Sequence, residues 1–164
     1  MSQTNDCFVA SEFTYPEYTS SQRDTLKEAI GILEAKLKKS IPFTDAKATQ
    51  KYCQLKLAGE KDEFFACLFL DNQHKLISFE KLFRGSIAEA HVHPRVVVRR
   101  SLELNAASII FTHNHPSGTV TPSKPDIAIT QRLKDVLKVV DVRVLDHIIV
   151  GTEGSTSMAE SGLV

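Results

Sequence analysis

Cysteine is scarce in this chain of 164 residues, and the few cysteines are not spaced for bridges or metals. Cys7, Cys53 and Cys67 form no C-x-x-C pair and are odd in number. The sequence therefore lacks the usual signature of a disulfide framework and of a thiolate zinc site, and we expect the protein to reside in a reducing compartment. Cys53 and Cys67 also lie in apolar segments without a basic neighbour, which favours core packing over a nucleophilic role.

An excess of charge and a long apolar run are also missing. Twenty Lys and Arg balance twenty Asp and Glu. Without a global positive field to attract phosphates, we expect at most weak binding to nucleic acid. The longest apolar run, residues 64–70, is far shorter than the ~20 residues of a membrane helix, and the first residues do not resemble a secretory signal. We therefore expect a cytoplasmic protein with no membrane partner.

The composition that is present indicates a folded protein. Hydrophobic residues make up 42% of the chain and charged residues 24%, which is typical of a globular domain, and the length suits one domain. Residues 1–19 are polar and aperiodic, and we predict an irregular arm there. A helix is predicted within residues 20–43, and residues 44–164 are predicted to form the main domain.

Hydrophobic periodicity and turn residues predict alternating helices and strands. The expected helices are 21–39, 44–57 with Thr44 as cap, 94–105 and a helix that begins at Ser123, and the expected strands are 63–71, 76–82, 106–112 and 142–150. The first two strands are separated only by a short turn around Asn72 and Gln73, which predicts a hairpin. Helices that alternate with apolar strands predict a layered α/β fold.

Two H-x-H pairs stand out among the six histidines, and one of them carries a metal-site pattern. In extended backbone, residues i and i+2 face the same side, so His113 and His115, at the exit of a predicted strand, can direct two imidazoles to one point. Asp126 follows in the first turn of the next helix. These ligands suit zinc, with one position left for water. The pair His91 and His93 has no carboxylate at a comparable spacing.

A purely structural interpretation exists for part of this pattern. Ser123 and Asp126 have the spacing of a capping box, in which both would only satisfy the N-terminus of the helix. Two histidines on one face, together with a carboxylate that returns after a short loop, are harder to explain by capping. Metal binding is therefore the interpretation that we favour.

The string H-x-H-P, six residues, S-x-x-D runs from His113 to Asp126 and resembles the JAMM (MPN-type) metalloprotease motif at every defined position. The residues from His113 to Gly118 are similar to the bacterial RadC branch of this family, in a short form without an N-terminal helix-hairpin-helix region. Supporting similarity extends over residues 44–164. The resemblance implies a RadC-like JAMM/MPN domain with a cytidine-deaminase-like α/β sandwich, in which helices flank a mixed sheet.

The resemblance also implies an activity. It indicates a zinc-dependent peptidase or isopeptidase that acts on a peptide or protein conjugate, with the zinc held by His113, His115 and Asp126. It assigns Glu63 as the general base and Ser123 as a helper that stabilises the oxyanion. From the residues alone, other glutamates are equally eligible as the base, and they are Glu60, Glu89 and Glu103.

A second function remains open at this point. The DNA-repair label of the RadC family suggests a nucleic-acid factor associated with repair or mobile elements, in which the metal is structural or serves phosphodiester chemistry. The zero net charge weighs against it. The sequence does not determine the substrate or the oligomeric state. It also leaves open the roles of five residues, and they are Arg95, Arg99, Arg100, Asp146 and His147.

Overall fold

The computed structural model describes residues 19–39, 43, 45–57, 59–85, 92–152 and 154–164, without the side chains of 33–39. The predicted arm lies outside these residues except for Thr19, as do Thr44, Glu89 and His91. Along the chain the elements are α1 (Ser20–Lys39), α2 (Ala46–Leu57), β1 (Phe64–Leu70), β2 (Leu76–Arg84), α3 (Pro94–Glu103), β3 (Ser108–Asn114), α4 (Lys124–Lys138), β4 (Arg143–Val150) and β5 (Ser155–Ser157).

The strands form one mixed sheet in the order β2-β1-β3-β4-β5. β1 pairs antiparallel with both β2 and β3, whereas β3 and β4 are parallel and are joined through α4. The predicted hairpin of the first two strands is confirmed. Its turn is held by the Asp71 carboxylate, which accepts hydrogen bonds from the backbone N–H groups of Gln73 and Lys75 at 2.8 and 2.9 Å.

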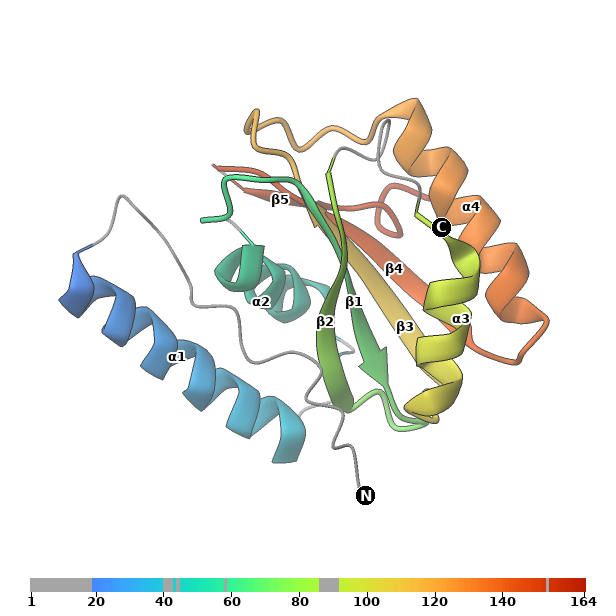
Figure 1. The fold of residues 1–164 in the computed structure, drawn as a ribbon, viewed down its shortest axis with the longest axis horizontal. Helices are drawn as coiled ribbons and strands as arrows, with labels where there is room; N and C mark the ends of the chain where they lie inside the picture. The colour runs from blue at the N-terminus through green and yellow to red at the C-terminus, as the bar shows by residue number, and fades with distance from the viewer. Residues whose placement is uncertain (1–18, 40–42, 44, 58, 86–91, 153) are drawn as a thin grey trace, which may run out of the picture.

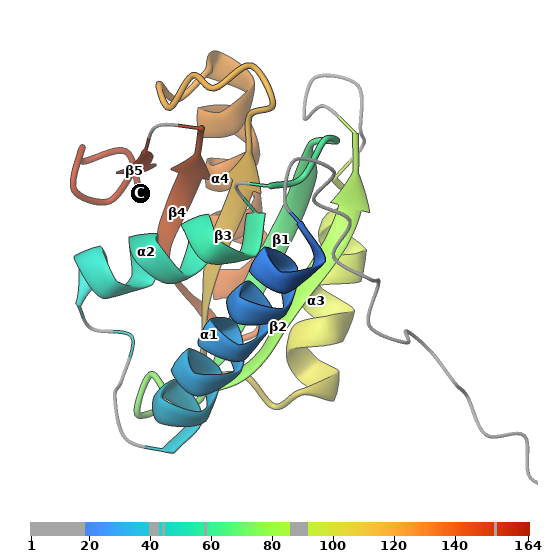
Figure 2. The same ribbon diagram turned by 90° about the vertical axis from the view of Figure 1, so that its left-hand side faces the viewer.

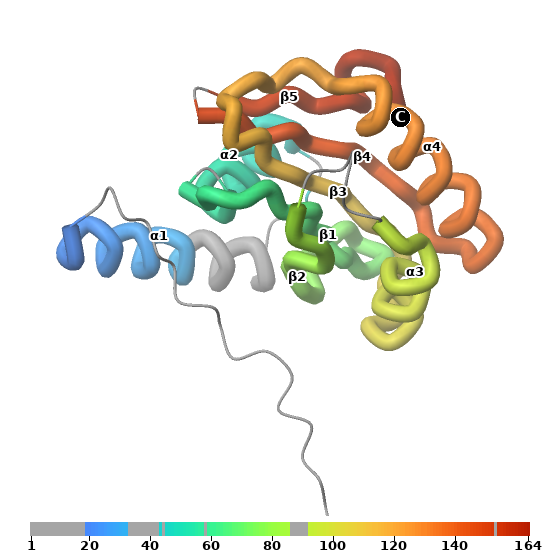
Figure 3. Tube along the Cα trace, turned by 45° about the horizontal axis from the view of Figure 1, so that its top comes forward, coloured from blue at the N-terminus to red at the C-terminus, as the bar shows by residue number. Residues whose placement is uncertain are grey.

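Helices cover both faces of the sheet, as the predicted α/β fold requires (Figures 1 and 2). α2 packs on one face, and α1 lies against α2 and β2. α3 and α4 cover the opposite face, which Figure 3 shows from a tilted direction. Two hydrophobic clusters result, because alternate residues of each strand point to opposite faces. Leu68 and Ile110 belong to the cluster under α2, whereas Phe65 and Phe111 belong to the cluster under α3 and α4.

Three local details differ from the sequence-based expectation. α2 begins at Ala46, and Asp45 caps it, because its carboxylate accepts the N–H groups of Lys47 and Ala48 at 2.9 and 3.3 Å. The short strand β5 was not predicted. β3 begins at Ser108 rather than at residue 106, because α3 ends in a turn with Asn105 at φ 51°.

The shift of β3 matters for the site. His113 lies within the strand rather than at its exit, and His115 is the first residue after it.

Among the described helices, none is both long and apolar enough to span a lipid bilayer.

Candidate metal centre

The end of β3 positions the two histidines. His113 is fully buried on the sheet face that α4 covers, and His115 follows with a side chain that is 16% exposed. Asn114 points to the other face, where its amide accepts a hydrogen bond from Phe64 N and donates one to Asp62 O, both at 2.9 Å. The alternation predicted for this segment is therefore present, and the two imidazoles meet with their Nε2 atoms 2.8 Å apart.

The N-terminus of α4 brings Asp126 to the same point. Asp126 is 1% exposed, and its Oδ1 atom lies 3.3 Å from His113 Nε2 while its Oδ2 atom lies 3.7 Å from His115 Nε2. The capping box is also real, since Asp126 Oδ2 accepts the Ser123 N–H at 2.7 Å and Ser123 Oγ accepts the Asp126 N–H at 3.3 Å. Capping and metal binding are thus compatible, because the cap fixes Asp126 in place.

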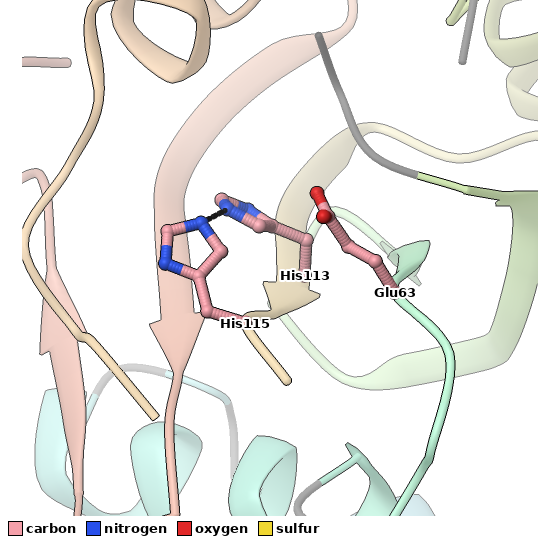
Figure 4. Close-up of side chains that lie close together, drawn as sticks. All are labelled: Glu63, His113 and His115. Atoms are coloured by element: carbon pink, nitrogen blue, oxygen red, sulfur yellow. Dashed lines mark hydrogen bonds between the residues drawn. The ribbon is translucent and has the colours of Figure 1, made fainter. Parts of the chain in front are cut away.

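Glu63 lies at the same site, although it comes from a distant part of the sequence. Phe65 pairs with His113 across β1 and β3, so the register carries Glu63 toward His115. One ligand atom from each of Glu63, His113 and His115 lies within 4.8 Å of the others. Figure 4 shows the Glu63 side chain extending toward the two imidazoles. Two carboxylates, Glu63 and Asp126, therefore border one pair of histidines.

The other described glutamates that the sequence left eligible are engaged elsewhere. Glu60 forms an ion pair with Lys81 at 2.6 Å. Glu103 pairs with Arg99 and Arg100 at the end of α3, at 3.8 and 2.8 Å. Neither belongs to the group around the histidines.

Burial keeps the inner histidine neutral. Loss of solvent lowers the pKa of His113 from 6.5 to about 4, even though the nearby Asp126 carboxylate acts in the opposite direction. The pKa of His147, which lies behind His113, is also lowered by burial. Neutral imidazoles are the form that binds metals, because a protonated ring nitrogen has no lone pair to donate.

The donor set fits zinc. Two neutral imidazoles and a carboxylate are borderline nitrogen and oxygen ligands, which zinc takes in catalytic sites with a further position for water or substrate. His115 Nδ1 lies 2.8 Å from Thr119 O, and this carbonyl fixes the ring with Nε2 directed at Asp126. A hydrogen bond of this kind behind a ligating histidine is a regular feature of metal sites.

His147 and Thr130 also belong to the surroundings of the site, and the sequence alone did not assign them. His147 Nε2 lies 2.8 Å from His113 Nδ1, and Thr130 Oγ1 lies 2.5 Å from His147 Nδ1. Asp146 has a different role. Its buried carboxylate accepts hydrogen bonds from His147 N, Ala159 N and Ser157 Oγ, which ties the C-terminal turn to β4.

The arginines that suggested a basic patch mostly have acidic partners. Arg84 pairs with Asp62 at 2.6 Å, and Arg100 forms two contacts with Glu80 at 2.6 and 2.7 Å. Arg99 pairs with Glu103, while Arg95 is exposed and has no ion pair in the part of the chain that the structure describes. These pairs leave little unbalanced positive charge on this surface.

The cysteines of the described region are buried and free. Burial raises the pKa of the Cys53 thiol to about 12 and also raises the pKa of Cys67. Both thiols are therefore protonated at neutral pH and unsuited to nucleophilic attack. Core packing, the interpretation favoured from the sequence, agrees with this environment.

The fold and the histidine-carboxylate centre together define a JAB/MPN type of domain. The family model described as a RadC-like JAB domain matches residues 43–163, and the chain belongs to this family. This agrees with the resemblance found in the sequence, and the mixed five-stranded sheet flanked by helices is consistent with the family fold.

Relatives of two lengths are similar to the chain. A UPF0758 protein of Vibrio cholerae is 49% identical over 156 residues, which cover 93% of this chain and 98% of that protein. UPF0758 proteins of Nitrosococcus oceani and Polaromonas are 53% and 52% identical over 132 residues, or 80% of this chain. The matched part spans only 59% of the length of each of these two proteins.

Proposed function

We propose that the protein is a zinc-dependent amide hydrolase of the peptidase or isopeptidase type. The observation that carries this proposal is the meeting of His113 Nε2 and His115 Nε2 with both oxygens of Asp126, beside the carboxylate of Glu63. Membership of the JAB family supports it. Zinc at such a site supplies Lewis-acid chemistry, because it acidifies water and polarises a carbonyl oxygen.

Glu63 is the general base in this proposal. Its carboxylate accepts a proton from the attacking water as the oxygen adds to the amide carbonyl carbon. When the C–N bond breaks, the same carboxyl group delivers the proton to the departing amine nitrogen. Glu63 suits this role because it comes from outside the capping box that holds Asp126.

Ser123 assists by donating a hydrogen bond to the developing oxyanion. Its Oγ atom already accepts the Asp126 N–H, and its hydroxyl proton remains available to donate. Ser123 is exposed, and the His115 side chain is 16% exposed. We expect a peptide or a protein conjugate to approach the site past these two residues. The buried free thiols support a cytoplasmic location.

The alternative function in nucleic-acid binding is tested separately. Ion pairs neutralise Arg84, Arg99 and Arg100, and the whole chain has no net charge. We expect weak, salt-sensitive binding to DNA of random sequence. Submicromolar binding at physiological salt would favour the alternative over the peptidase proposal.

The first experiment measures metal content and identity. Purified protein should contain one zinc per chain by elemental analysis, and anomalous scattering at the zinc edge should place it beside His113 and His115. His115→Ala should lose the metal. Full zinc content in this variant would contradict the ligand assignment.

The second experiment separates the base from the ligands. A peptide and conjugate library is screened for cleavage that a chelator abolishes. Glu63→Gln should then keep zinc and the fold but lose turnover by roughly 10² to 10⁴-fold, because glutamine cannot take the proton from water. Glu60→Gln is the matched control, since Glu60 lies three residues away and pairs with Lys81. Wild-type turnover in Glu63→Gln would place the base elsewhere, and loss of zinc would make Glu63 a ligand.

A further inference from the structure

A row of buried polar groups runs from the candidate metal centre into the protein. His113 Nδ1 lies 2.8 Å from His147 Nε2, and His147 Nδ1 lies 2.5 Å from Thr130 Oγ1. The Thr130 hydroxyl in turn lies 2.6 Å from the backbone carbonyl oxygen of Asp126, one helical turn earlier in α4. His113, His147 and Thr130 are each at most 1% exposed. The row therefore begins at one candidate ligand, His113, and ends on the backbone of another, Asp126.

Two directions of hydrogen bonding are conceivable along this row. In the first, Thr130 donates to His147, which donates to His113, and the proton on His113 Nε2 then faces His115. In the second, Thr130 donates to the Asp126 carbonyl, His147 Nδ1–H donates to Thr130, and His113 Nδ1–H donates to His147. Only the second direction leaves the Nε2 lone pair of His113 free for a metal.

The Asp126 carbonyl selects the second direction. A carbonyl oxygen has no proton, so the close approach of Thr130 Oγ1 to Asp126 O requires the hydroxyl proton to lie between them. Thr130 then has only lone pairs to offer His147, and His147 must donate from Nδ1. Because neutral His147 carries one ring proton, its Nε2 accepts the proton of His113 Nδ1.

The tautomer of the outer histidine, His115, is also fixed by a hydrogen bond, which comes from a different segment of the chain. Thr119 O can only accept, so His115 carries its proton on Nδ1 and presents a bare Nε2. Both Nε2 atoms, which face Asp126 and lie 2.8 Å apart, thus carry lone pairs with no proton between them, and both rings are held from behind by acceptors on two different segments. The rings of Phe65 and Phe111 pack against the imidazole of His147, with ring centroids 5.5 and 5.8 Å from it, and this packing restricts rotation of the His147 ring.

We propose that Thr130 and His147 are positioning residues that keep His113 Nε2 unprotonated before the metal arrives. The inference rests on the proposed function, because it assigns these residues to the same zinc site. Their hydrogen bonds select one tautomer of His113, and the backbone of Asp126 sets that selection. Outer partners of this kind typically contribute about 10 to 100-fold in metal affinity.

The test removes one hydroxyl and compares it with a matched hydroxyl elsewhere. Thr130→Val keeps the shape but leaves His147 Nδ1–H without an acceptor, so zinc affinity by chelator competition should fall about 10 to 100-fold. Thr130→Ser should restore it. Thr49→Val is the control, because Thr49 in α2 is also buried and also donates to a carbonyl four residues earlier, at 2.8 Å. It should bind zinc like the wild type.

A second measurement does not depend on activity or on the loaded protein. Long-range ¹H–¹⁵N spectra of the imidazoles in the metal-free wild type should show protons on Nδ1 of His113 and His147. Protons on Nε2 of both rings would overturn the inference, as would Thr130→Val protein with unchanged zinc affinity. If the wild type binds no zinc at all, the proposed function fails, while the tautomers still decide whether the row of hydrogen bonds runs as stated.

Discussion

Gly151 gives a sharp test of how the loop after β3 holds the outer histidine. It follows β4 and lies against the backbone of Gly118. A Cβ atom at position 151 would come within 2.7 Å of Val120 Cγ1 and 3.0 Å of the Gly118 carbonyl carbon, and even closer to the Gly118 oxygen. The neighbouring carbonyl of Thr119 is the acceptor for His115 Nδ1. The methyl group added by Gly151→Ala would therefore displace the segment that orients the candidate ligand His115.

The size of the effect follows from these contacts. Carbon atoms pack at about 3.5 to 4.0 Å, so the loop must move by about 1 Å to admit the methyl group. Overpacking of this kind typically costs about 1 to 3 kcal/mol of stability. A shift of about 1 Å is also enough to break the 2.8 Å hydrogen bond to His115. We expect zinc affinity to fall by about 10-fold or more.

Urea unfolding and chelator competition measure the two effects. Gly154→Ala is the matched control, since Gly154 lies in the same turn and a Cβ there would have no atom within 4 Å. The control should keep both stability and zinc affinity. Gly151→Ala protein that binds zinc as tightly as the wild type would refute the reasoning, because the loop would then not determine the position of His115.

Two further predictions concern the whole centre. Without metal, stability should fall as the pH drops from about 6.5 toward 4, because the unfolded chain takes up a proton on His113 in this window and the folded protein does not. The loss from pH 7 to pH 5 should be about 2 kcal/mol by urea unfolding, with more from His147, and His113→Gln should lessen it. Excess zinc at about 100 times its dissociation constant should raise the melting temperature by about 5 to 10 °C in calorimetry, and a chelator should reverse this. A similar rise in His115→Ala would show that the zinc binds elsewhere.

The elements that the sequence predicted well are those with strong local signals. β1 is a continuous apolar run, and α3 begins at Pro94, where a helix start was expected. β5 was missed because Ser155–Ser157 has no hydrophobic pattern and is paired only through the backbone of β4. The start of β3 was misplaced because the turn after α3 depends on the conformation of Asn105, and apolar character alone does not reveal it.

The residues of the candidate site also fall into two groups, those that a local sequence pattern revealed and those that only the fold brings together. Motif spacing alone nominated His113, His115 and Asp126, and the structure places them together. The sequence left the role of His147 open and did not point to Thr130, because their contact requires the register of β4 and the rotation of α4. One signal was available in the sequence, since Thr130 lies four residues after Asp126, on the same helix face as the buried Leu133. A polar pair at the head of an apolar stripe indicates a buried polar contact.

The two carboxylates at the centre have different surroundings, and this difference argues for different roles. Asp126 is tied to the N-terminus of α4, where the backbone of Ser123 donates to one of its oxygens and the helix end favours a negative charge. An anchored anion of this kind suits a permanent ligand. Glu63 comes from the segment before β1. In the sheet, β1 and β4 lie on opposite sides of β3, so Glu63 reaches the imidazoles from the β1 side, away from β4. A base must take up and release a proton in each cycle, so the carboxylate outside the capping box is the one that can change its charge without disrupting the end of a helix.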